Sequence, residues 1–240
     1  MTTTKSPKTL VVDIGGTNIK LLASGQKEPL KIPSGPTLTA TKMVRVVKDA
    51  VRTWECDRIT LGYPAPVING RPLREPHNLG GGWVGFDFAK AFGCPVKVIN
   101  DAAMQALGSY EGGRMLFLGL GTGLGSAMIV DGMLEPMELA HLPYKEGKTY
   151  EDYLGLRGLE RLGKKRWRRH VAKVVKMLKE ALDADYVVLG GGNSKKLKEL
   201  PPGTCLGSNE NAFRGGFRLW EQSNQSASAK TPKTGALFAV

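Results

Sequence analysis

The chain has 240 residues, of which 41% are hydrophobic and 23% charged, the balance of a globular protein with a packed core, so wholesale disorder is excluded. The length fits one two-lobed fold or two small domains that share a cleft. The net charge of +12 is unevenly spread, because an acidic middle over residues 101–160 lies between basic segments. Basic flanks suit a polyanion or a substrate with several phosphates, although surface lysine kept for solubility explains the same charge.

Three cysteines, Cys56, Cys94 and Cys205, are too few and too scattered for a disulfide framework or a CxxC zinc site. They indicate reduced thiols and a cytoplasmic protein. No apolar run approaches the ~18 residues of a membrane-spanning helix. The first eight residues lack the apolar stretch of a secretory signal.

Three segments share one design, an apolar β-branched run that ends in a glycine loop. They cover residues 10–18, 116–125 and 186–194, and each predicts a buried strand followed by a tight turn. Glycine permits positive φ and close approach of a ligand, and the exposed N–H groups of such a turn suit phosphate oxygens.

The apolar spacing predicts helices over residues 39–54 and 101–110, and strands near 59–62 and 96–99, which together give an α/β alternation. A further amphipathic helix carries nine Lys or Arg residues and no acid between Arg161 and Lys179. We expect its apolar stripe to pack in the core, although a membrane-surface helix has the same pattern. That stripe consists of Trp167, Val171, Val174, Val175, Leu178 and Leu182.

The glycine loops match neither the GxxxxGK[ST] pattern of P-loop NTPases nor the GxGxxG pattern of dinucleotide-binding folds. Asp13 ends the first of these strands and precedes Thr17. We interpret Asp13 as a carboxylate that holds Mg²⁺ through water while Thr17 and backbone N–H groups meet a phosphate. An Asx-turn that only shapes the loop is the alternative.

Polar side chains follow two other strands. Asn100 and Asp101 come directly after the strand at 96–99, where Asp101 is a candidate general base and an ordinary helix N-cap is the alternative. Glu138 and His141 lie three residues apart, a spacing that suits sugar hydroxyls. Metal binding is a rival explanation for that pair, but no other histidine or cysteine lies near it in the sequence.

The ordered set of motifs resembles the ROK sugar kinases (repressors, open reading frames, kinases), and among them the polyphosphate-glucokinase-like branch. The resemblance covers roughly residues 9–220. The matching pieces are Asp13-Ile-Gly-Gly-Thr-Asn18, Gly62-Tyr-Pro-Ala-Pro66, Asn78-Leu79 with Trp83, Asn100-Asp101-Ala102, residues 119–126, Glu138-Leu-Ala-His141 and Gly190-Gly-Gly192.

The resemblance implies an α/β, actin-like ATPase (ribonuclease H-like) fold with two lobes around a cleft. It also implies phosphoryl transfer from polyphosphate, ATP or both to the 6-hydroxyl of glucose, with Mg²⁺ as cofactor. Asp101 matches the catalytic aspartate. The implied sugar-binding residues are Asn78, Asn100, Asp101, Glu138, His141 and Glu151. The implied phosphate- and nucleotide-binding residues are Asp13, Gly15, Gly16, Thr17, Asn18, Lys20, Gly121, Thr122, Gly123, Gly190, Gly191 and Gly192.

The chain also departs from the family pattern. The CxCGxxGCxE run is absent, so we expect no structural zinc, and Ala65 and Ala140 stand where many members have glycine. No N-terminal helix-turn-helix precedes the first strand, which argues against a transcription factor and against specific nucleic-acid binding. We expect lobes over residues 9–100 and 101–221, disordered ends over 1–8 and 222–240, no membrane association, and a homodimer, as is common among relatives.

Two rival functions remain open at this stage. One is a catalytically weak sugar-sensing or polyanion-binding protein of the same fold, which would be expected to lose Asp101. The other is a kinase for another hexose, such as mannose or glucosamine.

Overall fold

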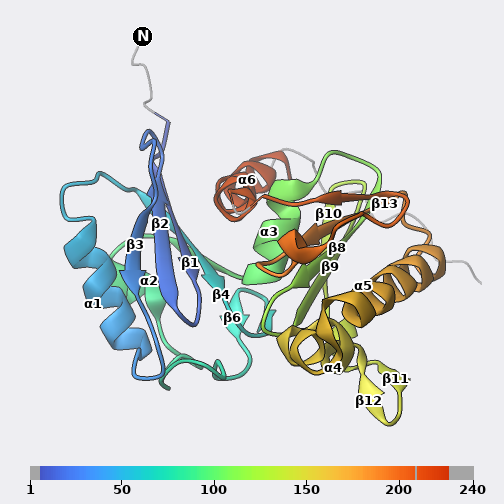
Figure 1. The fold of residues 1–240 in the computed structure, drawn as a ribbon. Coiled ribbons are helices and arrows are strands. Elements are labelled where there is room, and N and C mark those ends of the chain that lie inside the picture. Colours follow the sequence, from blue (N-terminus) through green and yellow to red (C-terminus); the bar gives the residue numbers. More distant parts are fainter. Residues whose placement is uncertain (1–5, 209, 227–240) are drawn as a thin grey trace, which may run out of the picture.

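A computed structural model describes residues 6–208 and 210–226, and it has two α/β lobes joined through a central pair of helices (Figure 1). The N-terminal lobe is a five-stranded sheet in the order β3-β2-β1-β4-β7, in which β4 and β7 run parallel to β1. Its elements are β1 (Thr9–Ile14), β2 (Asn18–Ala23), β3 (Leu30–Pro33), α1 (Ala40–Ala50), β4 (Arg58–Tyr63), the small hairpin β5 (Val67–Ile68) and β6 (Arg71–Pro72), α2 (Phe88–Phe92) and β7 (Val96–Asn100).

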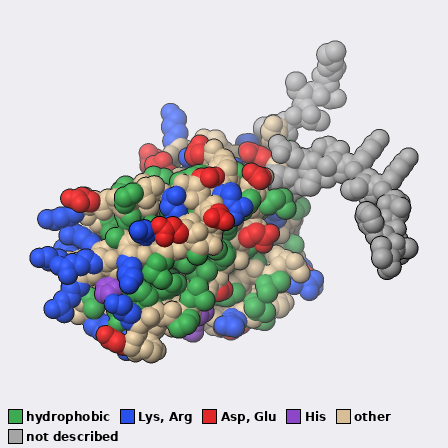
Figure 2. Space-filling view, turned by 90° about the vertical axis from the view of Figure 1, so that its right-hand side faces the viewer, with side chains coloured by type: hydrophobic (Ala, Val, Ile, Leu, Met, Phe, Trp, Pro, Cys, Tyr) green, Lys and Arg blue, Asp and Glu red, His purple; other side chains and the backbone are tan. Residues whose placement is uncertain are grey.

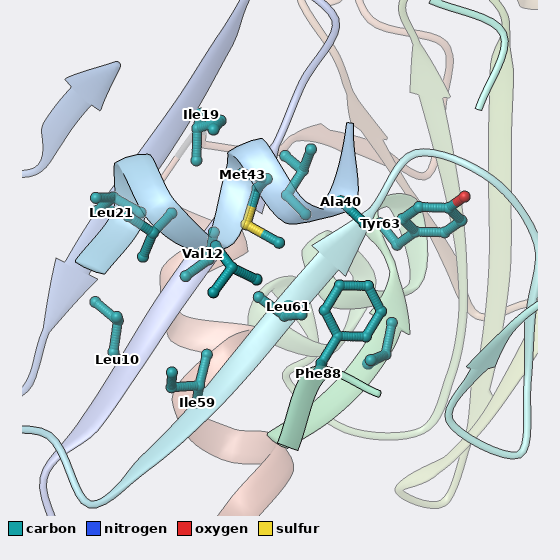
Figure 3. Packing of buried hydrophobic residues seen from close by; sticks show 14 of the residues in the cluster. Leu10, Val12, Ile19, Leu21, Ala40, Met43, Ile59, Leu61, Tyr63 and Phe88 are labelled. Carbon is teal, nitrogen blue, oxygen red and sulfur yellow. The ribbon is translucent and has the colours of Figure 1, made fainter. Parts of the chain in front are cut away.

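Every residue of β1 is buried, because this strand is covered on both of its faces. On one face, Val12 and Leu61 of the sheet pack with Met43 of α1 (Figure 3). The helix expected over residues 39–54 is α1, which is shorter than predicted. Thr39 caps its start by accepting a hydrogen bond from the backbone N–H of Lys42, and Val51 to Trp54 form a turn.

The C-terminal lobe repeats the design of the first sheet. Its strand order is β10-β9-β8-β13-β14, with β8, β9 and β10 antiparallel and with β13 and β14 parallel to β8. Its elements are α3 (Asp101–Ser109), β8 (Arg114–Leu120), β9 (Leu124–Val130), β10 (Met133–Met137), η1 (Leu139–His141), β11 (Pro143–Lys145), β12 (Lys148–Thr149), α4 (Tyr150–Leu154), α5 (Leu156–Ala181), β13 (Tyr186–Gly190), η2 (Ser194–Lys196), β14 (Thr204–Leu206) and α6 (Asn211–Ser226).

The basic helix expected from Arg161 to Lys179 is α5. Gly163 kinks it with a φ of 70°. The predicted apolar stripe packs in the core of the C-terminal lobe, with five of its six residues fully or almost fully buried and Leu182 partly buried against them. Its basic residues mostly face solvent.

Helices α3 and α6 connect the two lobes. Their backbones approach so closely that a Cβ atom on Gly108 would run into the carbonyl oxygen of Asn211, and only glycine fits there. From α6, Ala212 and Phe213 share a buried cluster with Val11 of β1 and with Val188 of β13. Thus α6 covers the second face of the N-terminal sheet while belonging, in sequence, to the C-terminal lobe.

Two expectations about the chain ends need correction. The sequence predicts a disordered tail from residue 222, but α6 continues through Ser226 and so includes the first five residues of that segment. Residues 227–240 lie outside the described range. The N-terminal segment was expected to be disordered through residue 8. Residues 1–5 lie outside the described range, but Lys8 donates a 2.7 Å hydrogen bond from its backbone to Asp57.

Among the described residues, no helix combines the length and the apolar composition needed to cross a membrane.

Candidate active site

Asp101 opens α3 at the point where β7 ends. Asn100 is the N-cap, because its side-chain oxygen accepts hydrogen bonds from the backbone N–H groups of Ala102 and Ala103 at 3.0 and 3.1 Å. The amide nitrogen of Asn100 donates to the carbonyl of Ala65 at 3.2 Å. The capping interpretation therefore holds for Asn100, and the neighbouring Asp101 occupies the first position of α3, where the chain passes from the first lobe to the second.

The environment of Asp101 suits a group that accepts protons near neutral pH. Burial, and then the nearby carboxylate of Asp13, raise the pKa of Asp101 from 3.8 to about 7. A hydrogen bond from the backbone of Ala102 and the charge of Lys20 oppose this rise. A base is most effective when its pKa lies close to the working pH.

The first glycine loop joins β1 to β2 and places a cation beside Asp13. Asp13 and Lys20 are cross-strand partners, and the Lys20 ammonium lies 3.0 Å from the carboxylate of the almost fully buried Asp13. Ser34 holds the loop from outside by donating a 2.6 Å hydrogen bond to the carbonyl of Gly15. Asn78, expected to bind sugar, packs against this loop at Gly16.

The second and third glycine loops brace each other. The second is the turn between β8 and β9, and the third follows β13. Asn193 joins them, since its backbone N–H donates to the carbonyl of Leu120 at 2.9 Å and its side chain donates to the carbonyl of Gly121 at 2.8 Å. Gly191, with a φ of 78°, crosses so close to Leu120 that an added Cβ would lie 2.5 Å from its carbonyl oxygen.

Glu151, in the first turn of α4, packs against the second glycine loop. One carboxylate oxygen accepts a 3.2 Å hydrogen bond from the backbone N–H of Leu124 and covers Gly123, where a Cβ would collide with it. The other oxygen lies 3.3 Å from the guanidinium of Arg157. The residue expected to contact sugar therefore also braces the loop expected to bind phosphate.

A cleft of about 290 Å³ opens between the lobes. Three of the expected sugar-binding residues, Asn100, Glu138 and His141, line it. The Glu138 carboxylate lies 3.9 Å from the His141 ring, and both side chains are exposed. The rest of the lining is mostly apolar and comes from both lobes, namely Pro66, Val67, Ile68, Leu73, Arg74, Pro136 and Met137.

Three polar residues at the site escaped the sequence analysis. Arg74 lines the cleft, Arg157 pairs with Glu151, and Asn193 joins the glycine loops. Only Asn193 carried a local signal, since it follows the third glycine run directly.

Asp13 is a candidate oxygen donor for a metal ion in this site. Mg²⁺ prefers one or two carboxylates together with substrate phosphates, and the Asp13 carboxylate beside the first glycine loop fits that preference. Among the described residues, no three His, Cys, Asp or Glu side chains gather closely enough to hold a metal without such a substrate.

Comparison with known proteins supports the expected kinship. Polyphosphate glucokinases from Mycobacterium leprae and Mycobacterium tuberculosis (strain CDC 1551 / Oshkosh) are 27% and 28% identical to the chain, over 83% and 80% of its length and 68% and 80% of theirs. The crystal structure of an inorganic polyphosphate/ATP-glucomannokinase from Arthrobacter superposes with a TM-score of 0.76 at 24% identity. That match covers 90% of this chain and all of the other. The resemblance to the ROK sugar kinases is confirmed.

The fold expectation is confirmed as well, since the solved structures of ROK proteins share the architecture of both lobes. No profile of a known protein family matches the chain.

Proposed function

We propose that this ROK-type chain is a hexose kinase that transfers a phosphoryl group to the 6-hydroxyl of glucose. The observation that carries the proposal is Asp101, a carboxylate with its pKa raised to about 7 at the junction of the lobes, with glycine loops of both lobes near it. The kinship with polyphosphate glucokinases supports the same reaction.

In the proposed reaction, Asn100, Glu138 and His141 hold sugar hydroxyls in the cleft, which orients the 6-hydroxyl toward Asp101. Asp101 takes the hydroxyl proton as the bond from sugar oxygen to phosphorus forms. The bond from phosphorus to the rest of the donor breaks, and the electron pair leaves with the donor's next phosphate. General-base help of this kind is typically worth ~10²–10⁴ in rate.

The glycine loops hold the donor in this proposal. Backbone N–H groups around Gly15–Asn18 and Gly121–Gly123 meet phosphate oxygens, Lys20 adds positive charge, and the loop Gly190–Gly192 receives the adenosine when ATP is the donor. Asp13 would hold Mg²⁺ through water, and the bound ion would supply positive charge for the transferring phosphate. Closure of the lobes would exclude water that competes with the sugar.

Polyphosphate, ATP or both serve as the phosphoryl donor in our proposal, and the basic face of α5 favours polyphosphate. Figure 2, which views the side of the molecule where α5 lies, shows Lys and Arg side chains crowded along one edge. This face reaches the glycine loops through two hydrogen bonds: Arg168 donates to the carbonyl of Lys196 at 2.7 Å, and Lys196 donates to the Asn193 side chain at 2.8 Å. A long phosphate chain leaving the glycine loops would meet this surface.

A coupled assay for glucose 6-phosphate tests the proposal, with glucose and Mg²⁺ and with ATP and long-chain polyphosphate in parallel. The donor question needs a charge variant of α5, Lys165→Gln/Arg169→Gln/Lys173→Gln. A matched control removes three exposed lysines of the other lobe, Lys27→Gln/Lys31→Gln/Lys42→Gln.

We expect the α5 variant to raise the KM for polyphosphate about tenfold or more at low salt and to leave the KM for ATP unchanged. The control variant should change neither KM. If both variants changed the KM for polyphosphate equally, the charge on α5 would serve only solubility. No activity with either donor on glucose, mannose or glucosamine would overturn the kinase proposal in favour of a sugar-sensing protein.

Mannose is a second candidate acceptor, because the Arthrobacter neighbour is named a glucomannokinase. Ala140 is buried between Glu138 and His141, the two residues expected to bind sugar hydroxyls. It therefore borders the proposed sugar site, where a difference in side-chain size would affect which hexose is preferred. The same assay run with mannose decides this point.

A further inference from the structure

A hairpin separates two residues of the proposed sugar site. His141 ends η1, and Glu151 lies in the first turn of α4, so residues 142–150 are the chain segment that links the two. The base of the hairpin is closed by one backbone hydrogen bond of 3.0 Å, from Tyr150 to Leu142. Beyond that bond, strands β11 and β12 form a short two-stranded ribbon, which is too small to be stable by itself.

A cluster of aromatic rings fastens this hairpin to the body of the lobe. The hydroxyl of Tyr144, in β11, lies 3.0 Å from Nδ1 of His170, in the middle of α5. Tyr144 also stacks edge-on against Tyr153, with ring centroids 4.9 Å apart, and Tyr153 meets the His170 ring at 4.7 Å. At the tip of the hairpin, Glu146 accepts a 3.1 Å hydrogen bond from the hydroxyl of Tyr153.

The surroundings of His170 favour its neutral form. Partial burial lowers the pKa of His170 from 6.5, and the positive charges of Lys145, Arg161 and Lys173 lower it further, while Glu146 opposes them. A neutral imidazole carries one N–H and one bare nitrogen, so Nδ1 either accepts a hydrogen bond from the Tyr144 hydroxyl or donates one to it, according to the tautomer. His170 therefore joins a residue of the hairpin by a directional bond to the 26-residue helix α5, whose apolar stripe packs in the core of the lobe.

We propose that His170, through its hydrogen bond with Tyr144, is a positioning residue that holds the 142–149 hairpin in place and so aligns His141 and Glu151 for the acceptor sugar. This inference rests on the proposed function for its kinetic consequence, but not for the ordering of the hairpin. No local sequence pattern marks His170 for this role, because its partners lie 26 and 17 residues away along the chain.

The test compares two single variants that keep the rings and remove the bond, Tyr144→Phe and His170→Phe, with the double variant. Tyr186→Phe is the matched control, because it removes a hydroxyl that accepts a hydrogen bond elsewhere in the same lobe. Steady-state kinetics give KM and kcat for glucose, and hydrogen–deuterium exchange reports on residues 139–151.

We expect either single variant to raise the KM for glucose about 2- to 10-fold, the worth of one hydrogen bond, with kcat within about twofold of wild type. The double variant should resemble either single variant, because both remove the same bond. Exchange should quicken over residues 139–151, and the Tyr186→Phe control should change neither measurement.

An unchanged KM in both folded single variants, or additive effects in the double variant, would overturn the positioning role. A role limited to general stability would instead lower the active fraction, and with it the apparent kcat, at constant KM. If the wild-type chain phosphorylates no hexose, the proposed function fails. Independently of that result, unchanged exchange over residues 139–151 in the variants would refute the claim that the Tyr144–His170 bond holds the hairpin.

Discussion

Replacing Asp101 with asparagine tests the buried base through its effect on folding as well as on catalysis. The unfolded chain gives Asp101 its ordinary pKa of 3.8, whereas the folded chain raises it to about 7. Between these values the folded state binds more protons than the unfolded state, so the free energy of unfolding decreases as the pH rises through that window. At 1.36 kcal/mol per pKa unit, the carboxyl group costs about 4 kcal/mol of stability at pH 8 and about 2 kcal/mol at pH 5.5.

Asparagine carries no charge at either pH. We therefore expect the advantage of Asp101→Asn over wild type, measured by urea unfolding, to be about 2 kcal/mol larger at pH 8 than at pH 5.5. Taking the difference between the two pH values cancels any constant effect of the amide. The same variant should bind glucose while kcat falls by at least ~10². A stability difference that is equal at both pH values would refute the argument from burial, and near-normal turnover would remove Asp101 from its catalytic role.

Three further predictions follow from the glycine loops, from Lys20 and from the junction of the lobes. Gly191→Ala should lower the free energy of unfolding by about 1–3 kcal/mol, because it combines positive φ with a clash, whereas Gly192→Ala, with open space around it, should be nearly neutral in the same urea titration. Lys20→Met removes a charge that lowers the pKa of Asp101, so the acid limb of the kcat–pH profile should move to higher pH; an unmoved limb would contradict that coupling. Thr60→Val removes a buried hydroxyl that makes two hydrogen bonds to α6 and should cost about 1–3 kcal/mol, and an unchanged melting temperature would contradict this.

The sequence predicts the local elements of this fold well, because their signals are local. An apolar run followed by glycines marks β1, β8 and β13, and the spacing of the apolar stripe marks α5 with its buried face. The position of Asp101 after a strand also follows from the sequence alone. Asn100 both caps the helix and lines the cleft, so the two expectations made for it are compatible.

What the sequence misses depends on contacts between distant segments. The spacing of apolar residues in α6 does not indicate which elements the helix packs against. Its contacts with both lobes therefore could not be predicted from the sequence. An exposed arginine looks the same whether it lines a cleft, as Arg74 does, or pairs with Glu151, as Arg157 does. The aromatic partners of His170 come from a hairpin and a helix elsewhere in the chain, so the sequence around it does not reveal them.

The place of α6 in the chain has a consequence during synthesis on the ribosome. Residues 211–226 emerge after all the strands of both sheets, yet they cover the face of β1 that carries Val11. Until α6 has left the exit tunnel, that apolar face of the N-terminal sheet is uncovered, and exposed apolar surface of this kind favours aggregation and chaperone binding. Strand β1 therefore gains its α6 cover only after residues 211–226 have been made, and a nascent chain stalled before residue 211 should be bound by chaperones even though its N-terminal sheet is fully synthesised.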